Sequence, residues 1–543
     1  MYRQFKQQQE TMVKNDIEVG SRIVCDGFIA TVRYMGTVPP TEGQWLGVEW
    51  DDSERGKHDG SKDGIVYFKT SSPTGGSFIR PKKAEVGMSC FAAVNERYGL
   101  IDETDANTDK LFINTGRNKT TTSVELVGFD KVNKKQSEFE KLEEVVLRNM
   151  KVFGAASYHL LSQNVANIIE LDLSQNLIPS WEEVSKITNQ LKLLKSLNIS
   201  ENRLTLPENP SKLKECFSSL QTLYMNRMKL QMSFSDILFC SEMWPNLENL
   251  HICFLELQTL TNPRNLLNRL KILNLESNPL DNWDEVMKLS SLKRLETLVL
   301  NGTGLDQISL PGNPTEKTTA FTNLLSLSLS RNKISEWSSI NELNKLMKLE
   351  EIRFKKNPLC ETVNVETLRQ LLIAKLGNLK VCDRTEVTTA ERKGSEIDYL
   401  KRFGPMWLEA GGNSDPILNK PSAEFILQHP RYQHIVEHYG AAEQSEMKQQ
   451  STTLKDNLIS VSITCPQSPP KKTLTKKLPL TMTVQKVKTL VNRLLKADIS
   501  TLKLSYISKD TTGPEIDLDN DLRQLSFYSV ENGDTLIAKW CQQ

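Results

Sequence analysis

The sequence predicts a multidomain protein with a small all-β domain first, a long α/β repeat solenoid in the middle and a small α+β domain last. Three observations predict this order. Glycine-rich β-type runs occupy residues 17 to 88, a leucine pattern recurs from residue 142, and strand and helix patterns alternate after residue 454. A chain of 543 residues is also too long for one hydrophobic core, since domains average about 150 residues.

The composition is that of an ordinary soluble protein, with 38% hydrophobic and 25% charged residues and a formal net charge of +1. This balance argues against nucleic acid as the main partner, because proteins that neutralise phosphates carry a clear basic excess. No stretch approaches the roughly 18 apolar residues that span a bilayer, and the N-terminus lacks the apolar core of a secretory signal. The nine cysteines include no C-x-x-C pair. We therefore expect a cytoplasmic protein with reduced thiols and no membrane contact.

The first domain carries a dense set of glycines and aromatic residues. Trp45-Leu46-Gly47-Val48-Glu49-Trp50 is followed by Gly56-Lys57-His58-Asp59-Gly60, and then by Gly76-Ser77-Phe78-Ile79-Arg80-Pro81. This pattern resembles the CAP-Gly domain family over residues 17 to 88. The resemblance implies a groove that binds acidic C-terminal tails ending in an aromatic residue, such as the Glu-Glu-Tyr end of α-tubulin.

The residue types suit such a ligand. Glycines in a tight loop let backbone amides approach an extended peptide, and Lys57 can meet a carboxylate in a charge-assisted hydrogen bond. The resemblance implies that Trp45 and Phe78 wall the aromatic pocket and that Arg80 adds positive charge. The family usually has Asn at the position of His58 and often an aromatic residue at that of Pro40, which predicts a shallower pocket. The expected tail-binding residues are Trp45, Gly56, Lys57, His58, Asp59, Gly60, Phe78 and Arg80.

From Leu142 onward the template L-x-x-L-x-L-x-x-N-x-L recurs about every 26 residues through nine repeats, a pattern typical of leucine-rich repeats. A single repeat cannot bury its leucines, so neighbours must stack into a solenoid, predicted here for residues 142–403 with a C-terminal cap. The template asparagine should bond to backbone groups in the turn after each strand. It is Asn176, Asn202, Asn278, Asn332 and Asn357, and Met150, Met228, Leu255 and Thr303 replace it in the other repeats.

The exposed strand positions should line the concave face that repeat proteins use for partners. The central column is Val146, Asp172, Asn198, Tyr224, His251, Asn274, Val299, Ser328 and Arg353. Its middle is aromatic, and aromatic clusters often anchor interfaces. Our hypothesis for a binding surface on this face comprises Tyr224, His251, Phe254 and Arg353.

The remaining segments are predicted from local pattern. Residues 89–141 form a connecting segment with β-type pieces and a helix over 131–141, and residues 404–453 form a linker.

Residues 454–543 resemble the ubiquitin-like β-grasp fold. The chain ends without a Gly-Gly tail, which indicates a binding module rather than a conjugated modifier. Its basic half should attract acidic partners through Lys471, Lys472, Lys476 and Lys477.

Enzymatic signals are missing from the sequence. There is no G-x-x-x-x-G-K-[ST], G-x-G-x-x-G, G-x-S-x-G or H-E-x-x-H motif for nucleotide, acyl-transfer or zinc chemistry. His429, His434 and His438 lie close together, but we interpret them as part of a solvated polar helix. We therefore expect no catalytic residues, no metal and no cofactor, and a protein that is not an enzyme.

The order of the three domains narrows the interpretation. CAP-Gly, leucine-rich repeats and a ubiquitin-like domain together resemble the tubulin-folding cofactors, a family of tubulin chaperones. The resemblance implies a cytoplasmic, cytoskeleton-associated protein that captures α-tubulin, joins other tubulin-folding cofactors in assembling the αβ heterodimer, and can also dissociate it. The alternatives are a microtubule-associated CAP-Gly adaptor and a ubiquitin-system adaptor, the latter resting on the last domain alone.

Overall fold

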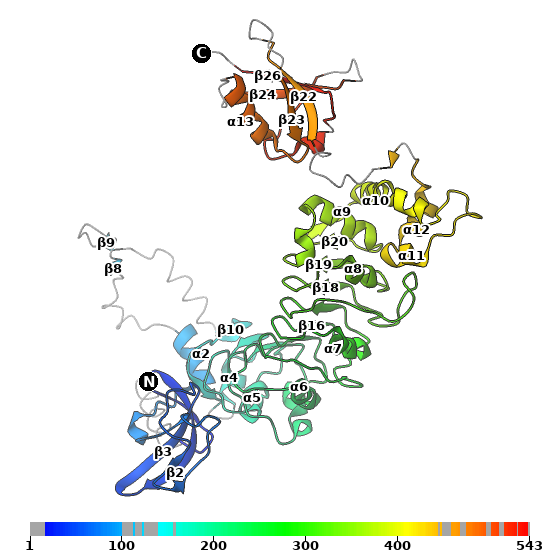
Figure 1. The fold of residues 1–543 in the computed structure, drawn as a ribbon. Coiled ribbons are helices and arrows are strands. Elements are labelled where there is room, and N and C mark those ends of the chain that lie inside the picture. The colour runs from blue at the N-terminus through cyan, green and yellow to red at the C-terminus, as the bar shows by residue number, and fades with distance from the viewer. Residues whose placement is uncertain are drawn as a thin grey trace. The chain divides into compact units, whose positions relative to one another are not determined.

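The computed structural model describes residues 17–99, 112–113, 122–123, 139–155, 159–443, 446–447, 458–466, 474–495, 501–509, 515–528 and 530–540. It divides into two compact units, residues 1–400 with 406–442, and residues 401–405 with 443–543. Within the described residues, no helix is long and apolar enough to cross a membrane. Figure 1 traces the elements of both units.

The N-terminal domain is an antiparallel sheet with the strand order β1-β2-β3-β6, which confirms the predicted all-β domain. Apolar residues of its strands, among them Ile23, Val32 and Val48, fill a small core of their own. A short hairpin, β4-β5, lies between β3 and β6 in the chain. The elements are β1 (Arg22–Cys25), β2 (Phe28–Val38), β3 (Thr41–Trp50), β4 (Ser61–Lys62), β5 (Ile65–Val66), β6 (Gly76–Ile79) and the 3-10 helix η1 (Pro81–Lys83).

The segment after this domain differs from the expected β-type pieces. A short strand β7 (Met88–Ser89) leads into a helix, α2 (Cys90–Tyr98), whose first turn is capped by the Ser89 hydroxyl accepting from the Ala92 amide. One face of α2 is buried in the core of the first repeats, and this burial stabilises a helix that the local pattern did not indicate. Most of the helix predicted over 131–141 lies outside the described residues. Three short elements complete this part: β8 (Phe112–Ile113), β9 (Thr122–Ser123) and the 3-10 helix η2 (Phe139–Lys141).

Residues 142–388, here called the repeat region, form a large β/α domain around one eleven-stranded sheet. Neighbouring strands from β10 to β20 are parallel, and β21 turns back antiparallel at the end. A separate short strand, β11 (Val152–Gly154), pairs with β7. The sheet strands are β10 (Glu144–Val146), β12 (Glu170–Asp172), β13 (Ser196–Asn198), β14 (Thr222–Tyr224), β15 (Asn249–His251), β16 (Ile272–Asn274), β17 (Thr297–Val299), β18 (Ser326–Ser328), β19 (Glu351–Arg353), β20 (Val381–Cys382) and β21 (Thr385–Glu386).

Each three-residue strand of the eleven-stranded sheet buries its middle residue. Leu197, Leu223 and Leu250 are completely buried, and they occupy matching positions on adjacent strands. The template asparagines are buried beside them. The Asn202 side-chain amide donates to the Leu173 carbonyl (2.9 Å) and the Ile199 carbonyl (3.0 Å), while its oxygen accepts from the Asn176 amide at 2.9 Å. The predicted role of the asparagines in the turns is therefore confirmed.

Most of the segments between the strands contain short helices, whereas those between β15 and β16 and between β17 and β18 contain none; Figure 1 shows α5, α6, α7 and α8 along one side of the sheet. The other, open face carries the predicted column, whose register is confirmed from Val146 to Arg353. The connecting helices are α4 (Leu160–Asn164), α5 (Trp181–Thr188), η3 (Pro210–Phe217), α6 (Phe234–Cys240), η4 (Ser241–Met243), α7 (Trp283–Met287), η5 (Lys288–Ser291), α8 (Trp337–Leu343) and η6 (Pro358–Glu361).

The expectation of a linker over residues 404–453 is wrong for residues 404–443, which are folded. Helix α10 continues through Gly404 and Pro405, because Trp407 beyond them is almost fully buried and packs on Tyr432, with ring centroids 5.6 Å apart. Residues 444–445 and 448–453 lie outside the described part. The helices at this end are α9 (Val365–Lys375), α10 (Thr389–Glu409), α11 (Ala423–Gln428) and α12 (Tyr432–Tyr439).

The end of α11 is tied to the last repeats. The Asn341 side-chain amide donates to the Gln428 carbonyl at 2.9 Å, and the buried Lys375 ammonium donates to the same carbonyl at 3.0 Å. His429 follows and is buried, with its Nδ1 atom 2.6 Å from the Tyr399 hydroxyl oxygen. The interpretation of His429 as solvated is therefore wrong, whereas His434 and His438 are exposed on α12.

The C-terminal domain has a five-stranded sheet in the order β23-β22-β26-β24-β25, with β22 and β26 parallel. Helix α13 packs on it through Val484, Val487 and Val491, which confirms the predicted β-grasp arrangement. Lys476 and Lys477 are exposed on β23, while Lys471 and Lys472 lie outside the described residues. The elements are β22 (Leu458–Thr464), β23 (Leu474–Pro479), α13 (Val484–Leu495), β24 (Lys503–Ile507), β25 (Ile516–Asp517), η8 (Leu525–Tyr528) and β26 (Thr535–Lys539).

Candidate peptide-binding site

Five rings from four parts of the N-terminal domain gather into an aromatic cluster. Phe78 on β6 lies at the centre, with its ring centroid 4.9 Å from His58, 5.4 Å from Tyr67 and 5.6 Å from Phe68. Tyr34 on β2 joins them, 5.2 Å from Tyr67. Only Phe68 is fully buried, so the cluster offers ring surface to a ligand.

Gly56 and Gly60 flank Lys57 in its loop. The sequence suggested that they make room for a ligand, but the structure shows that they make room for the domain's own backbone. A Cβ atom on Gly56 would lie 2.1 Å from the Thr74 carbonyl oxygen, and one on Gly60 would lie 2.1 Å from the Phe68 carbonyl oxygen. Gly60 also has a φ of +98°. These glycines therefore let the loop pack against its own domain, in addition to any approach of a ligand.

Lys57 and His58 present hydrogen-bond donors beside the aromatic cluster. The Lys57 backbone is held by the Gly76 carbonyl at 2.7 Å, while its side chain is exposed and has no acceptor within bonding distance among the described residues. His58 accepts from the Gly60 amide at its Nδ1 atom (3.0 Å), which leaves the proton of the neutral ring on Nε2. Burial lowers the pKa of His58 below its usual 6.5, although nearby Asp59 opposes this shift. His58 is therefore a neutral donor near pH 7.

The other predicted residues of the site stabilise its frame. Asp59 accepts from the Ser61 amide at 3.0 Å and from the Ser61 hydroxyl, and these bonds lower the pKa of its carboxyl group. The Arg80 guanidinium lies 3.9 Å from the centre of the Trp45 ring and donates to the Glu42 carbonyl at 2.9 Å. Trp45 and Arg80 thus form a pair of their own, which does not include Phe78. Pro40 is exposed in the turn between β2 and β3.

A cluster of charges lies at the base of the loop and connects it to the repeat region. Asp51 binds Arg22 through two bonds of 2.6 and 2.5 Å, and Glu49 binds Arg33 at 2.6 Å. Arg203, from the turn after β13, reaches both carboxylates, at 3.3 Å from Asp51 and 3.4 Å from Glu49. The N-terminal domain and the repeat region are therefore in direct contact at the two residues that precede the Lys57 loop.

Glu49 is an unusually strong acid in this cluster. Burial alone would raise its pKa, but hydrogen bonds from Ser71 and Arg33 and the charge of Arg203 outweigh burial and lower the pKa to about 2. The Ser71 amide and hydroxyl donate to Glu49 at 3.0 and 2.6 Å. The carboxylate therefore stays charged at any physiological pH.

The open face of the repeat region brings the other predicted residues together in part. Tyr224 and His251 stack with ring centroids 4.3 Å apart and an interplanar angle of 17°. Phe254 is exposed in the turn after β15, under the Arg227 guanidinium at 4.2 Å. Arg353 lies four strands from His251 and bonds to Glu351, so it is separate from this aromatic pair.

Sequence reasoning missed Tyr34, Tyr67, Phe68 and Arg203 as site residues. Tyr34 lies in an ordinary strand pattern, and only the fold places it against Tyr67. Arg203 occupies a variable position of a repeat, and no local signal indicated its two distant partners. In the described part of the chain, no group of three or more His, Cys, Asp or Glu side chains could hold a metal ion.

Comparisons with known proteins agree with this architecture. A family model described as the CAP-Gly domain matches residues 19–84, and one described as a ubiquitin-like domain matches residues 458–537. The chain is 46% identical to tubulin-specific chaperone E of Xenopus laevis and 43% identical to that of Bos taurus, each over 96% of this chain and 98% of the relative. The solution structure of the C-terminal ubiquitin-like domain of mouse tubulin-specific chaperone e is 48% identical, covering 17% of this chain and 96% of that one, with a TM-score of 0.16.

Fold and site together define a CAP-Gly protein in which a large β/α repeat region separates the CAP-Gly domain from a ubiquitin-like domain. Identity above 40% over nearly the full length of both chains then decides the family. The chain belongs to the tubulin-specific chaperone E family.

The charge cluster predicts an acid dependence of the CAP-Gly domain. Because the pKa of folded Glu49, about 2, lies below its ordinary 4.5, this carboxylate contributes stability above about pH 4.5 that is lost as the pH falls towards 2. The contribution is about 3 kcal/mol. Glu49→Gln should therefore lower the protection of the β1 to β3 backbone amides against hydrogen exchange at pH 7. Between pH 5 and 2, this protection should change less in the variant than in the unaltered chain. The measurement is hydrogen exchange in urea, corrected for the intrinsic exchange rates.

Two variants sharpen this test. Glu54→Gln removes an exposed carboxylate of the same domain and should leave the profile unchanged. Arg203→Ala should lower protection of the same strands at pH 7 by less than Glu49→Gln does, because Arg22 and Arg33 still pair with the two carboxylates. An unaltered acid profile in Glu49→Gln would contradict the assigned role of this residue.

Proposed function

We propose that the protein is a tubulin-folding cofactor that captures α-tubulin through the acidic C-terminal tail. The observation that carries the proposal is the exposed Lys57 ammonium, which lies on a glycine-closed loop beside an aromatic cluster in a member of the tubulin-specific chaperone E family. An acidic tail that ends in an aromatic residue offers a carboxylate and a ring, which are the groups that Lys57 and this cluster can bind.

In the proposed complex the ammonium of Lys57 donates to the terminal carboxylate or to a tail glutamate. The Nε2 proton of His58 provides a second, neutral donor, so histidine can replace the asparagine that is usual in the family. The terminal aromatic side chain contacts the rings of Phe78 and Tyr67.

The remaining residues of the proposed site support the loop rather than contact the tail. The surrounding backbone is held by Trp45, Asp59 and Arg80, and the loop can close because Gly56 and Gly60 have no side chain.

We further propose that the repeat region is a leucine-rich repeat solenoid whose open face binds tubulin or another tubulin-folding cofactor. One parallel strand per repeat, a buried aliphatic residue in the middle of each strand from β12 to β19 and a buried asparagine in several turns support this assignment. The stacked Tyr224 and His251 rings give the face an amphipathic centre. Burial lowers the pKa of His251, so its ring is neutral near pH 7.

The ubiquitin-like domain adds a further binding module in this proposal, with other tubulin-folding cofactors or components of the ubiquitin system as its partners. Several modules on one chain make the second contact intramolecular, so weak individual contacts can add up to firm capture. Held in this way, α-tubulin could be joined to β-tubulin or taken out of the αβ heterodimer. We propose binding alone, without catalysis or a cofactor, in the cytoplasm and at the cytoskeleton.

The proposal predicts the effect of removing the Lys57 charge. Lys57→Ala should weaken binding of a peptide ending in Glu-Glu-Tyr about tenfold to a hundredfold, because a well-placed charge-assisted bond contributes roughly 1.5 to 3 kcal/mol. Isothermal titration of the full chain measures this loss. Lys69→Ala, which removes another exposed lysine of the same domain, should bind the peptide normally.

A double-mutant cycle tests the contact itself. A peptide without the final tyrosine should bind weakly to both proteins, and Lys57→Ala should then cost much less, since the two groups act on one contact. Strictly additive losses, or equal affinity of Lys57→Ala and the unaltered protein for the full peptide, would reject the assigned site.

The open face yields a separate prediction. Replacing Tyr224 and His251 together with alanine should weaken binding of αβ-tubulin about tenfold or more, because aromatic anchors at the centre of an interface typically cost about 2 kcal/mol or more when truncated. Val299→Ala, two strands away on the same face, should cost much less. Normal binding by a double variant with unchanged thermal stability would show that this face is not the interface.

A further inference from the structure

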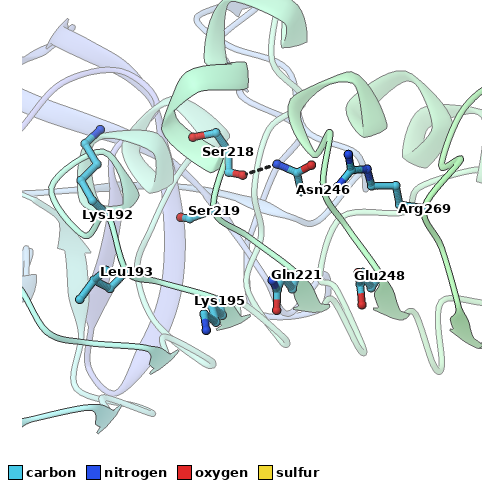
Figure 2. A pocket seen from close by; sticks show the side chains of 9 residues that line it. All are labelled: Lys192, Leu193, Lys195, Ser218, Ser219, Gln221, Asn246, Glu248 and Arg269. Carbon is cyan, nitrogen blue, oxygen red and sulfur yellow. Dashed lines mark hydrogen bonds between the residues drawn. The ribbon is translucent and has the colours of Figure 1, made fainter.

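The loops that lead into β13, β14, β15 and β16 form one edge of the repeat region, here called the leading edge, that the proposed function leaves unused. The residues directly before these strands form a backbone ladder. The Gln221 amide donates to the Lys195 carbonyl (2.8 Å), and the Glu248 amide donates to the Gln221 carbonyl (2.8 Å). A pocket of about 360 Å³ opens along this ladder, and Figure 2 shows the side chains that line it.

Positive charge dominates this pocket. Lys192, Lys195 and Arg269 are exposed in it, and Figure 2 shows Lys192 and Arg269 at opposite ends. The Lys192 ammonium donates to the neutral Asn189 side chain at 2.7 Å. Among the residues that the structure describes, no carboxylate forms an ion pair with any of these three groups. The acid of the pocket, Glu248, is already bound by Lys271 at 2.8 Å.

A second pocket of about 380 Å³ adjoins the first, and Arg269 lines both. Polar and apolar residues share its lining, and the apolar ones include Pro245, Leu266 and the buried Trp244 and Leu267. The Glu242 carboxylate in this pocket accepts from the Ser211 hydroxyl at 2.6 Å. The leading edge therefore places three unpaired cations next to a surface that suits an apolar side chain.

We propose that the leading edge docks an acidic peptide segment of a protein partner. Glutamate or aspartate side chains of the segment contact Lys192, Lys195 and Arg269, and one apolar side chain between them sits in the second pocket. This site is independent of the CAP-Gly contact, because it binds side-chain carboxylates within a peptide segment. It does not require the free C-terminus of a tail.

A peptide fits this edge better than a nucleic acid does. A continuous polyanion would pass Glu248 and Glu242, which lie on the same edge and repel evenly spaced phosphates. A peptide can place its carboxylates only where the cations are and present an apolar side chain to Leu266 and Leu267. The apolar lining would gain nothing from a phosphate backbone.

The test uses the full chain and the peptide Glu-Glu-Phe-Glu-Glu, with fluorescein attached to its N-terminal amine and with an amidated C-terminus. Fluorescence anisotropy at low salt should detect binding, which weakens as salt is added. The triple variant Lys192→Gln, Lys195→Gln, Arg269→Gln should bind about tenfold more weakly, since each exposed ion pair contributes a fraction of that factor. Lys57→Ala should bind normally.

A matched control removes the same charge from later loops of the same edge. Lys293→Gln, Arg294→Gln, Lys348→Gln should change affinity by less than about twofold, and replacing the peptide phenylalanine with serine should weaken binding to the unaltered chain. Equal losses in the two triple variants would reduce the effect to net charge and overturn the site. Three other results would also overturn the site. They are no binding of the peptide to the unaltered chain, weaker peptide binding by Lys57→Ala, and tighter binding of single-stranded RNA than of the peptide by the same three residues.

Discussion

The structure depends on one constraint: no strand of the repeat region can bury its own apolar residue without a neighbour on each side. Leu197, Leu223 and Leu250 are completely buried because adjacent strands in the same register cover them. The buried asparagines extend the constraint to the turns, since the Asn202 side chain bonds to the carbonyls of two successive repeats. Removing one repeat would expose apolar surface and leave buried polar groups without partners.

This constraint also requires the ends of the stack to be covered. At the start, α2 buries one face on the first repeats, and β7 pairs with β11. Arg203 then joins the first repeats to Asp51 and Glu49, directly before the Lys57 loop. These ion pairs thus anchor to the repeat region the part of the CAP-Gly domain that we propose binds a tubulin tail. At the other end, α9 to α12 cover the last repeats through a core of aromatic side chains.

Much of the fold followed from periodic signals in the sequence. The leucine template predicted the register of the open-face column from Val146 to Arg353, because a strict repeat leaves only one alignment. The glycine and aromatic motif predicted the N-terminal domain and its loop. What failed depended on contacts between distant segments. Helix α2 is stabilised by burial against the first repeats, and α10 continues past Gly404 and Pro405, which indicated a break, because Trp407 packs on Tyr432. Arg203 lies 152 residues from Asp51, and no local pattern can report such a pair.

The candidate site was predicted in its residue types more than in its geometry. The rings of His58 and Phe78 lie 4.9 Å apart, and Tyr34 joins them only because β2 pairs with β3. Arg80 was expected to add positive charge for a ligand, and in the structure its guanidinium covers Trp45. Sequence patterns indicate which residues are needed near each other, while the division of roles among them depends on three-dimensional contacts.

The central claim is that this protein acts on tubulin by binding it at several points at once. The most direct measurement is native size-exclusion chromatography of αβ-tubulin mixed with the purified full chain. The account predicts that α-tubulin elutes with the chain while the heterodimer peak decreases, in proportion to the amount of chain added. An unchanged heterodimer peak with no tubulin in the fractions of the chain would contradict the account, as would binding restricted to assembled microtubules in a pelleting assay.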